Sequence, residues 1–269
     1  MTVRGPVVGT ESSVGSSRHR TREPRVTVVI PALNEARNLA QVLPSLPPVH
    51  EVIVVDGYSP DDTHRTVRRV LPTARLICQT RYGKGNALVC GFAAATGDVI
   101  VMFDADGSAD PTEIPRFVAA LRDGADFAKG SRTRPGGGSD DLTRLRDLGN
   151  RGLTFLTNLL FRTRYSDLCY GYNAFWADVL PHLRLPEPDP PGTAVWGDGF
   201  EIETVLNCRV AAARLAVREV PSHERRRIHG VSNLHAVRDG VRVLRTILAE
   251  WRWRRSAAGQ GDRSYQLAG

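Results

Sequence analysis

DVIVMFDADGS (residues 98–108) carries the strongest strand signal in the chain. Its apolar, β-branched run is typical of a strand that is covered on both faces in a parallel sheet. Two carboxylates, Asp104 and Asp106, follow the run at once. Because open parallel sheets bind ligands at the carboxyl ends of their strands, the segment predicts a central strand with a ligand site at its end.

Strands and helices alternate on both sides of this segment. The patterns predict further strands at 26–30, 51–56, 74–78, 125–130, 170–176 and 213–220. They predict helices at 34–46, 63–70, 83–95, 111–121, 143–161 and 200–210. This alternation predicts an α/β fold of the Rossmann-like kind, with a mainly parallel central sheet flanked by helices.

The 269 residues fit one large domain, which we place at residues 25–235. Residues 1–24 mix Gly, Ser, Thr and Arg without periodicity, and we expect them and residues 255–269 to be disordered tails. Between the domain and the second tail, residues 236–254 predict a C-terminal amphipathic helix.

Composition excludes several classes of protein. No run approaches the ~18 apolar residues of a membrane-spanning helix, and the N-terminal residues lack the apolar segment of a secretory signal, so we expect a cytoplasmic protein. The four separated cysteines predict free thiols. The formal net charge of +7 indicates anionic partners: nucleic acid, a membrane surface or a diphosphate substrate.

Two predicted helices bear on membrane contact. Residues 156–161 end one helical stripe, and residues 241–255 pair apolar and Trp residues with arginines, as interfacial helices do. The alternative is that both helices pack on the sheet with their arginines outward. Peripheral contact with the inner face of the plasma membrane is therefore one expectation beside ordinary packing.

The Asp104-Ala105-Asp106 triplet is a candidate metal site. Two carboxylates held at a sheet edge repel one another, and a divalent cation relieves that repulsion. Oxygen ligands suit Mg²⁺ or Mn²⁺, usually completed by substrate phosphates and water. An isolated Asp-x-Asp is more often a solvated turn, so the triplet needs support from other residues.

Four segments supply that support, because their order resembles the family 2 glycosyltransferases of the GT-A fold. The segments are VVIPALNE (28–35), VVDGYSPDDT (54–63), GKGNALVCGFAAATGDVIVMFDADGSADP (83–111) and KGSR (129–132). They are most similar to the polyprenol-phosphate, or dolichol-phosphate, sugar transferases, over about residues 25–235. The resemblance implies an enzyme that uses a nucleotide-diphosphate sugar, UDP-linked by preference or GDP-linked, and a divalent metal, and we expect no nucleic-acid partner.

The resemblance also implies roles for individual residues. Asp106 is the expected metal ligand, with Asp104 closer to the ribose and sugar; Asp56 is expected at the base or ribose, and Arg132 at the diphosphate. The remaining donor-binding positions are Pro31, Ala32, Asn34, Glu35, Lys84 and Ala105. Fixed cations and a metal would balance the charge that grows on a diphosphate leaving group.

WGDGFEIET (196–204) is expected to serve the acceptor. Asp198 precedes a predicted helix whose first turn holds Glu201 and Glu203, where the helix dipole alone favours acids. The functional hypothesis is that one carboxylate takes the proton of an acceptor hydroxyl, with the inversion that the resemblance implies. Asp198 is preferred and Glu201 comes second.

RRRIHGVSNL (225–234) resembles the family's Arg-x-x-Gly-x-Ser-Lys-Leu segment. Arg225, Arg227, Ser232 and Asn233 are the expected contacts to diphosphate or acceptor, but Asn233 stands where a phosphate-binding lysine is expected. This departure favours a hydroxyl acceptor slightly over a polyprenyl or lipid phosphate. His229 is a candidate third metal ligand, because Mn²⁺ accepts imidazole.

Two other functions remain as alternatives. A sugar-phosphate nucleotidyltransferase uses a related sheet and metal but carries a Gly-x-Gly-Thr-Arg loop, where this chain has PALNEAR (31–37). A catalytically silent basic scaffold at the membrane surface would not need Asp104, Asp106 and Asp198 to remain acidic. Both are less favoured than glycosyl transfer.

Overall fold

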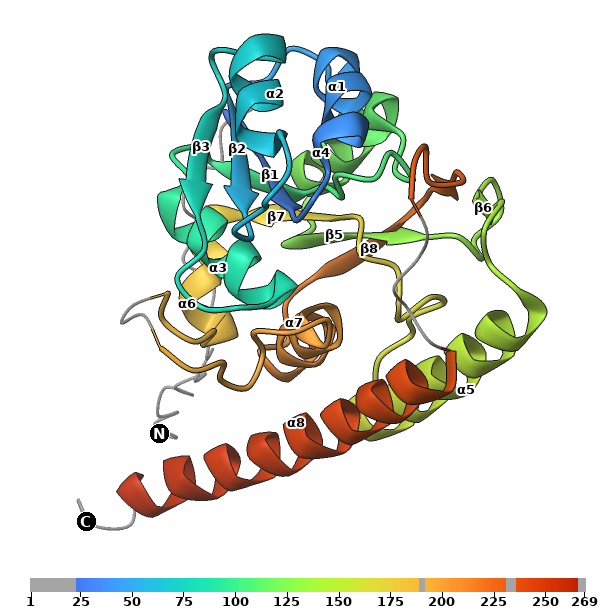
Figure 1. The fold of residues 1–269 in the computed structure, drawn as a ribbon. Coiled ribbons are helices and arrows are strands. Elements are labelled where there is room, and N and C mark those ends of the chain that lie inside the picture. Colours follow the sequence, from blue (N-terminus) through green and yellow to red (C-terminus); the bar gives the residue numbers. More distant parts are fainter. Residues whose placement is uncertain (1–22, 189–191, 231–235, 266–269) are drawn as a thin grey trace, which may run out of the picture.

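The computed structural model describes residues 23–188, 192–230 and 236–265 (Figure 1). Its centre is a seven-stranded sheet of order β3-β2-β1-β4-β7-β5-β8, in which β7 alone runs antiparallel to its neighbours. The strands are β1 (Val26–Ala32), β2 (Glu51–Asp56), β3 (Arg75–Cys78), β4 (Val99–Met102), β5 (Phe127–Ser131), β7 (Asn173–Trp176) and β8 (Val217–Pro221). A two-stranded ladder joins β6 (Gly138–Ser139) to β9 (His223–Glu224). The predicted α/β class with a mainly parallel sheet is confirmed.

Helices cover both faces of the sheet (Figure 1). On one face, Phe117 of α4 stacks on Tyr172; on the other, Phe92 of α3 meets Phe175 of β7 edge to face. Side chains alternate across a strand, so these contacts place α3 and α4 on opposite faces. The helices are α1 (Ala36–Ser45), α2 (Thr63–Val70), α3 (Lys84–Ala94), α4 (Ile114–Arg122), α5 (Arg144–Phe161), α6 (Leu180–Leu183), α7 (Ile202–Ala212) and α8 (Ala236–Tyr265), with short 3₁₀ turns η1 (Pro111–Glu113) and η2 (Ala177–Val179).

The strand register brings the polar strand ends together. Strand β1 pairs in parallel with β2, so that Ala32 stands opposite Asp56, and with β4, so that Val29 stands opposite Met102. The middle of all three strands is fully buried. The predicted ligand loops therefore leave one edge of the sheet side by side.

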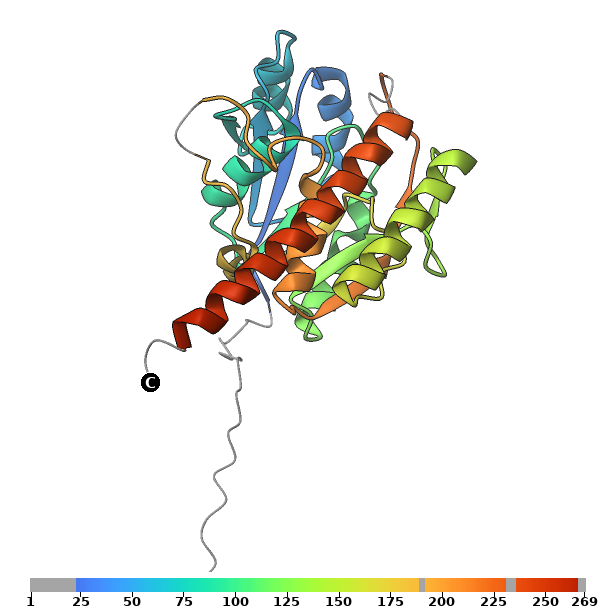
Figure 2. The ribbon, with the colours of Figure 1, turned by 90° about the horizontal axis from the view of Figure 1, so that it is seen from below.

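Helices α5 and α8 lie side by side in both views, outside the layers that cover the sheet (Figures 1 and 2). Phe161 of α5 and Ile247 of α8 belong to a second, smaller apolar cluster that joins them to α7. Helix α8 continues to Tyr265, past residue 254, where the sequence predicted its end; the division of the chain into a domain, a terminal helix and two tails stays a prediction. Among the described residues, no helix has both the length and the hydropathy needed to cross a bilayer.

Candidate active site

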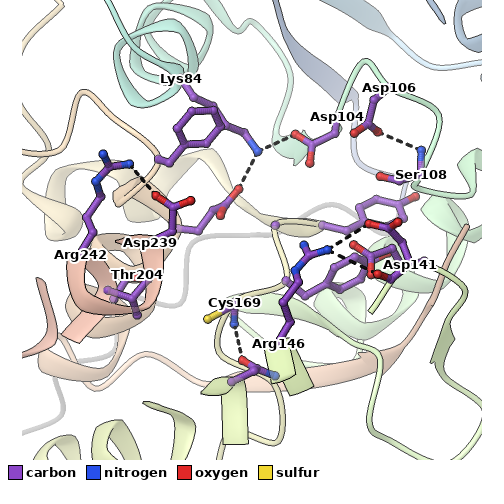
Figure 3. A pocket seen from close by; sticks show the side chains of 18 of the residues that line it. Lys84, Asp104, Asp106, Ser108, Asp141, Arg146, Cys169, Thr204, Asp239 and Arg242 are labelled. Atoms are coloured by element: carbon purple, nitrogen blue, oxygen red, sulfur yellow. Dashed lines mark hydrogen bonds and ion pairs between the residues drawn. The ribbon is translucent and has the colours of Figure 1, made fainter. Parts of the chain in front are cut away.

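A cavity of about 950 Å³ opens at the carboxyl ends of the parallel strands. Pro31 and Ala32 of β1, Lys84 of α3 and the Asp104–Asp106 loop line one part of it. The cavity continues between α5 and α8, so a polar end and an apolar end belong to one space. Figure 3 shows the side chains that converge there.

Lys84 joins two carboxylates from distant parts of the chain. Its Nζ lies 2.7 Å from Asp104 Oδ1 and 2.6 Å from Glu203 Oε1 of α7 (Figure 3). Burial alone would lower the pKa of the ammonium group, but the Asp104 and Glu203 carboxylates outweigh it, and the pKa lies above its ordinary value. Lys84 is therefore a fixed positive charge inside the cavity.

The glycines beside Lys84 explain the Gly-Lys-Gly sequence. Gly83 has a φ of +131°, and a Cβ at Gly85 would lie 1.8 Å from the carbonyl oxygen of Gly197. The carbonyl of Asp198 accepts hydrogen bonds from the backbone N–H groups of Gly85 and Asn86 at 2.7 and 3.1 Å. The absence of side chains thus lets the loop before α7 close onto the start of α3.

Asp106 is held beside an arginine of the late basic segment. Its Oδ2 lies 2.9 Å from Arg227 Nη2, and its Oδ1 accepts a hydrogen bond from the Ser108 N–H at 2.9 Å. Backbone bonds from Arg225 N–H to Ser108 O and from Ile228 N–H to Asp106 O fasten the segment to this loop. The structure therefore brings the predicted Asp106 and Arg227 together.

Three carboxylates, those of Glu35, Asp104 and Asp106, line this end of the cavity. Arg227 Nη1 also lies 3.7 Å from Glu35 Oε1, so two cations, Arg227 and Lys84, face the three carboxylates of Glu35, Asp106 and Asp104 and leave a net negative charge. Burial raises the pKa of the Glu35 carboxyl, and the nearby Asp106 and Asp104 add to this rise against the hydrogen bond from Asn38 and the charge of Arg227. Such a surplus of oxygen donors fits Mg²⁺ or Mn²⁺.

Asp56 keeps one oxygen without a partner. The residue is 1% exposed, its Oδ2 accepts from the Ser59 N–H and lies 3.0 Å from His64 Nε2, and its Oδ1 is buried without a hydrogen bond. Burial raises the pKa of the carboxyl, but the hydrogen bonds from Ser59 and His64 outweigh it and the pKa lies below its ordinary value. Close by, the exposed rings of Tyr58 and Tyr82 lie 5.7 Å apart.

Arg132 lines the cavity but is already saturated with carboxylates. Its Nε and Nη2 make a fork with Asp167 at 2.7 and 2.9 Å, its Nη1 lies 3.0 Å from Glu224 Oε2, and the guanidinium lies over the Tyr170 ring. Buried, paired arginines of this kind primarily shape a wall. The predicted diphosphate contact by Arg132 stays a prediction.

Asp198 forms a buried ion pair with Arg81, and its expected role as the catalytic base stays a prediction. Arg81 holds both of its carboxylate oxygens, at 2.7 and 3.0 Å, and the residue is 1% exposed. Burial raises the pKa of the Asp198 carboxyl, but the bond from Arg81 and the Val195 N–H outweigh it, and the pKa lies below its ordinary value. In this structure both carboxylate oxygens are engaged by Arg81, so the Asp198 side chain is held within the protein.

Glu201 likewise serves the local backbone, and its neighbour Glu203 reaches the cavity. Glu201 Oε1 accepts from the N–H groups of Gly197 and Gly199 at 3.3 and 3.2 Å. Glu203 lines the cavity beside Lys84. Glu203 is therefore the carboxylate of this turn that faces the cavity, and the sequence placed it on the same helical turn without preferring it.

The remaining predicted residues have varied surroundings. His229 faces α1, where its Nε2 lies 2.9 Å from Gln41 Nε2 and its backbone pairs with Asn38, so its role as a metal ligand stays a prediction. Arg225 lines the cavity and pairs with Asp110. Asn34 adopts a φ of 59°, and its N–H donates to Ser59. Ser232 and Asn233 lie outside the described residues.

The far end of the cavity combines leucines with arginines. Arg146 of α5 pairs with Asp141 at 3.1 Å, and Arg242 of α8 with Asp239 at 3.3 Å (Figure 3). Apolar side chains from the same two helices complete this end: Leu145, Leu148, Leu153, Leu156, Val237, Val241 and Leu244. An anionic group joined to an apolar chain would fit such a lining.

Comparison with known proteins agrees with this geometry. An uncharacterized glycosyltransferase of Mycobacterium tuberculosis is 42% identical over 107 residues, 40% of this chain and about half, 48%, of that protein's length. The polyprenol monophosphomannose synthase of Mycolicibacterium smegmatis is 31% identical over 239 residues, covering 84% of this chain and 86% of that protein. In structure, glucosyl-3-phosphoglycerate synthase from Mycobacterium tuberculosis, crystallised with Mn²⁺, UDP and glucosyl-3-phosphoglycerate, aligns with a TM-score of 0.65 at 25% identity over 84% of this chain and 80% of that chain.

The family model for glycosyl transferase family 2 matches residues 27–184. This stretch contains β1 to β7 and, with them, Lys84, Asp104 and Asp106. The match covers more than half of the chain, and the resemblance predicted from the sequence motifs is confirmed. The protein belongs to glycosyltransferase family 2.

Proposed function

We propose that the protein transfers a sugar from a nucleotide-diphosphate sugar, by preference a UDP-sugar, to a lipid-phosphate acceptor with inversion. The observation that carries the proposal is one cavity with the Asp104–Asp106 carboxylates at one end and an apolar space between α5 and α8 at the other. UDP is preferred because the solved relative with Mn²⁺ was crystallised with UDP. Lipid phosphate is preferred because of the leucine and arginine lining.

The residues at the polar end have complementary roles in this reaction. Asp106, Asp104 and Glu35 would hold Mg²⁺ or Mn²⁺, which when bound supplies positive charge to the diphosphate. The buried Asp56 Oδ1, which has no hydrogen bond, is suited to accept an N–H of the nucleobase, and the exposed Tyr58 and Tyr82 rings lie beside it. Lys84 fixes Asp104 toward the sugar and adds a permanent cation.

Transfer requires the bond between the anomeric carbon and the diphosphate oxygen to break as the acceptor oxygen bonds to that carbon. The nucleoside diphosphate leaves with the electron pair, and its added charge is the feature that a cationic site stabilises most in the transition state. A phosphate acceptor is already anionic and gives up no proton. Arg146 and Arg242, on the two helices that line the apolar end, are cations that could receive its headgroup.

A hydroxyl acceptor is a second candidate, and Glu203 is the observation that favours it. Its carboxylate lies in the cavity and is held by Lys84, where it could take a proton from an attacking hydroxyl. The two acceptor classes therefore differ in whether Glu203 is needed.

Donor binding provides the first test. In a calorimetric titration of UDP-glucose, UDP-N-acetylglucosamine and GDP-mannose, we expect one donor to bind in Mn²⁺ and to lose that binding in excess chelator, because the carboxylates need a cation before they accept a diphosphate. Identical binding in metal and chelator would remove metal dependence from the proposal. Binding of GDP-mannose alone would replace UDP as the nucleotide.

Glu203→Gln separates the acceptor classes. With a water-soluble prenyl phosphate as acceptor, we expect kcat to fall by less than about tenfold, whereas transfer to a hydroxyl would fall by about 10²-fold or more, the usual effect of losing a positioned base. Glu201→Gln is the matched control, since that carboxylate binds the backbone outside the cavity. Activity on the corresponding prenyl alcohol exceeding that on the phosphate would overturn the lipid-phosphate acceptor.

A further inference from the structure

One side of α5 is an exposed apolar stripe. Leu145, Leu148, Phe155 and Leu159 are 62, 69, 69 and 65% exposed. Their spacing, with glycines at 149 and 152 between them, follows the helical period and places them along one side. The described residues therefore leave each of these three leucines and the phenylalanine more than half exposed.

Arginines border the stripe. Arg144 and Arg151 lie on α5 about a quarter turn from it, and both are exposed. On α8, Val237, Val241 and Leu244 are 64, 43 and 37% exposed, and the exposed Arg238, Arg245 and Arg252 follow beside them. An apolar face with a flanking row of arginines is the pattern of a helix that lies in a membrane interface.

The two helices present these faces together. They lie side by side on one outer surface (Figure 2), and the cavity opens between them. Leu145, Leu148, Val237, Val241 and Leu244 line the cavity and are exposed at the same time. The apolar end of the cavity is therefore continuous with the exposed faces.

The stripe extends beyond what a bound acceptor requires. Phe155 and Leu159 are exposed but do not line the cavity. A single lipid chain between the helices would leave both in water, whereas a bilayer surface would cover them as well. The flanking arginines favour a bilayer with anionic headgroups, because they attract negative charge.

We propose that the outer face of α5 and α8 docks on an anionic lipid bilayer, with Leu145, Leu148, Phe155 and Leu159 inserted at the level of the headgroups. We define this surface, with Val237, Val241 and Leu244 and the flanking arginines, as the α5–α8 platform. Docking would place the apolar opening of the cavity against the membrane, where a lipid acceptor could enter without passing through water. The platform goes beyond the proposed transfer reaction and does not depend on it.

Flotation with vesicles tests the platform in the full chain. We expect the protein to float with vesicles of equal parts phosphatidylglycerol and phosphatidylcholine, more weakly with phosphatidylcholine alone, and less as salt rises. Phe155→Ser with Leu159→Ser should weaken the partition constant by about 10²-fold, the loss expected when two large apolar side chains no longer insert. Both residues are solvent-exposed, so the variant should fold, which circular dichroism would verify.

A charge-reversal pair isolates the electrostatic part. Arg151→Glu with Arg245→Glu should weaken binding to the anionic vesicles by about 10²-fold. Arg68→Glu with Arg69→Glu is the matched control, because both residues are exposed and their helix, α2, lies on the opposite side of the molecule from α5 and α8 (Figure 1). If both variants lost vesicle binding equally, the binding would depend only on the net charge of the protein, and the platform would be overturned.

Further outcomes separate the platform from its rivals. Failure of the parent protein to float, or unchanged flotation of the Phe155/Leu159 variant, would overturn it. A concentration-dependent dimer in sedimentation velocity that this variant abolishes would assign the stripe to a second copy instead. Flotation without donor binding would support the platform and overturn the proposed transfer reaction. Transfer to a soluble prenyl phosphate without flotation would support the transfer reaction and overturn the platform.

Discussion

Asp106→Ala is expected to abolish metal-dependent donor binding and to lower kcat/KM by about 10³-fold. The substitution removes one of the carboxylates that converge on the cavity and leaves Arg227 without its 2.9 Å partner. The donor diphosphate then loses the cation that balances its charge as the sugar departs. Calorimetry with and without Mn²⁺, beside an assay of sugar transfer, measures both effects.

Two variants make the Asp106 result interpretable. Asp106→Asn keeps an oxygen for the Ser108 N–H, so a similar loss in this variant would assign the effect to charge and not to the shape of the loop. Asp123→Ala removes an exposed carboxylate elsewhere, which pairs with Arg218, and should leave donor binding unchanged. Donor binding by Asp106→Ala at parental affinity in Mn²⁺ would show that the metal is held elsewhere.

The parts of the site that could be predicted are encoded within short segments. Residues 98–108 contain both the apolar run that becomes β4 and the carboxylates that follow it, so local pattern alone places Asp104 and Asp106 at the sheet edge. The motif around Lys84 similarly predicts a position at the ligand site, and Lys84 lines the cavity. In each case the side chain points from an element whose position the βα alternation already determines.

Pairing between distant residues could not be predicted. Arg81 and Asp198 are separated by 117 positions in the sequence. Whether the Asp198 carboxylate is free or neutralised therefore depends on a residue that no local pattern points to. Glu201 and Glu203 present a related problem, because side chains two positions apart on a helix point about 200° away from each other. The rotation of α7 decides which of them faces the cavity, and that rotation depends on packing against α3 and α8.

The outer stripe of α5 shows a third limit. A row of leucines at helical spacing is the same in sequence whether a sheet covers it or solvent meets it. The sequence alone therefore does not separate packing on the sheet from membrane contact, whereas the fold shows which side of α5 is covered. Thr154 and Thr157 turn inward, and Phe155 and Leu159 turn outward, the reverse of what hydropathy alone predicts.

Asp198→Asn is expected to lower the free energy of unfolding by about 3–5 kcal/mol, because it leaves the Arg81 charge buried without a counter-charge. The exposed pair offers a matched control: Asp123→Asn, opposite Arg218, should change the free energy of unfolding by about 0–1 kcal/mol. Urea denaturation at neutral pH measures both values.

The pH dependence of that loss identifies its origin. A carboxyl whose pKa is depressed by folding contributes stability above its unfolded pKa of about 4 and loses it as the pH falls through the folded value. The difference between the parent and Asp198→Asn should therefore be constant above about pH 5 and shrink at lower pH. A variant that keeps parental stability but loses about 10²-fold in kcat would instead support Asp198 as the base, because the loss of activity would then not follow from a loss of folding.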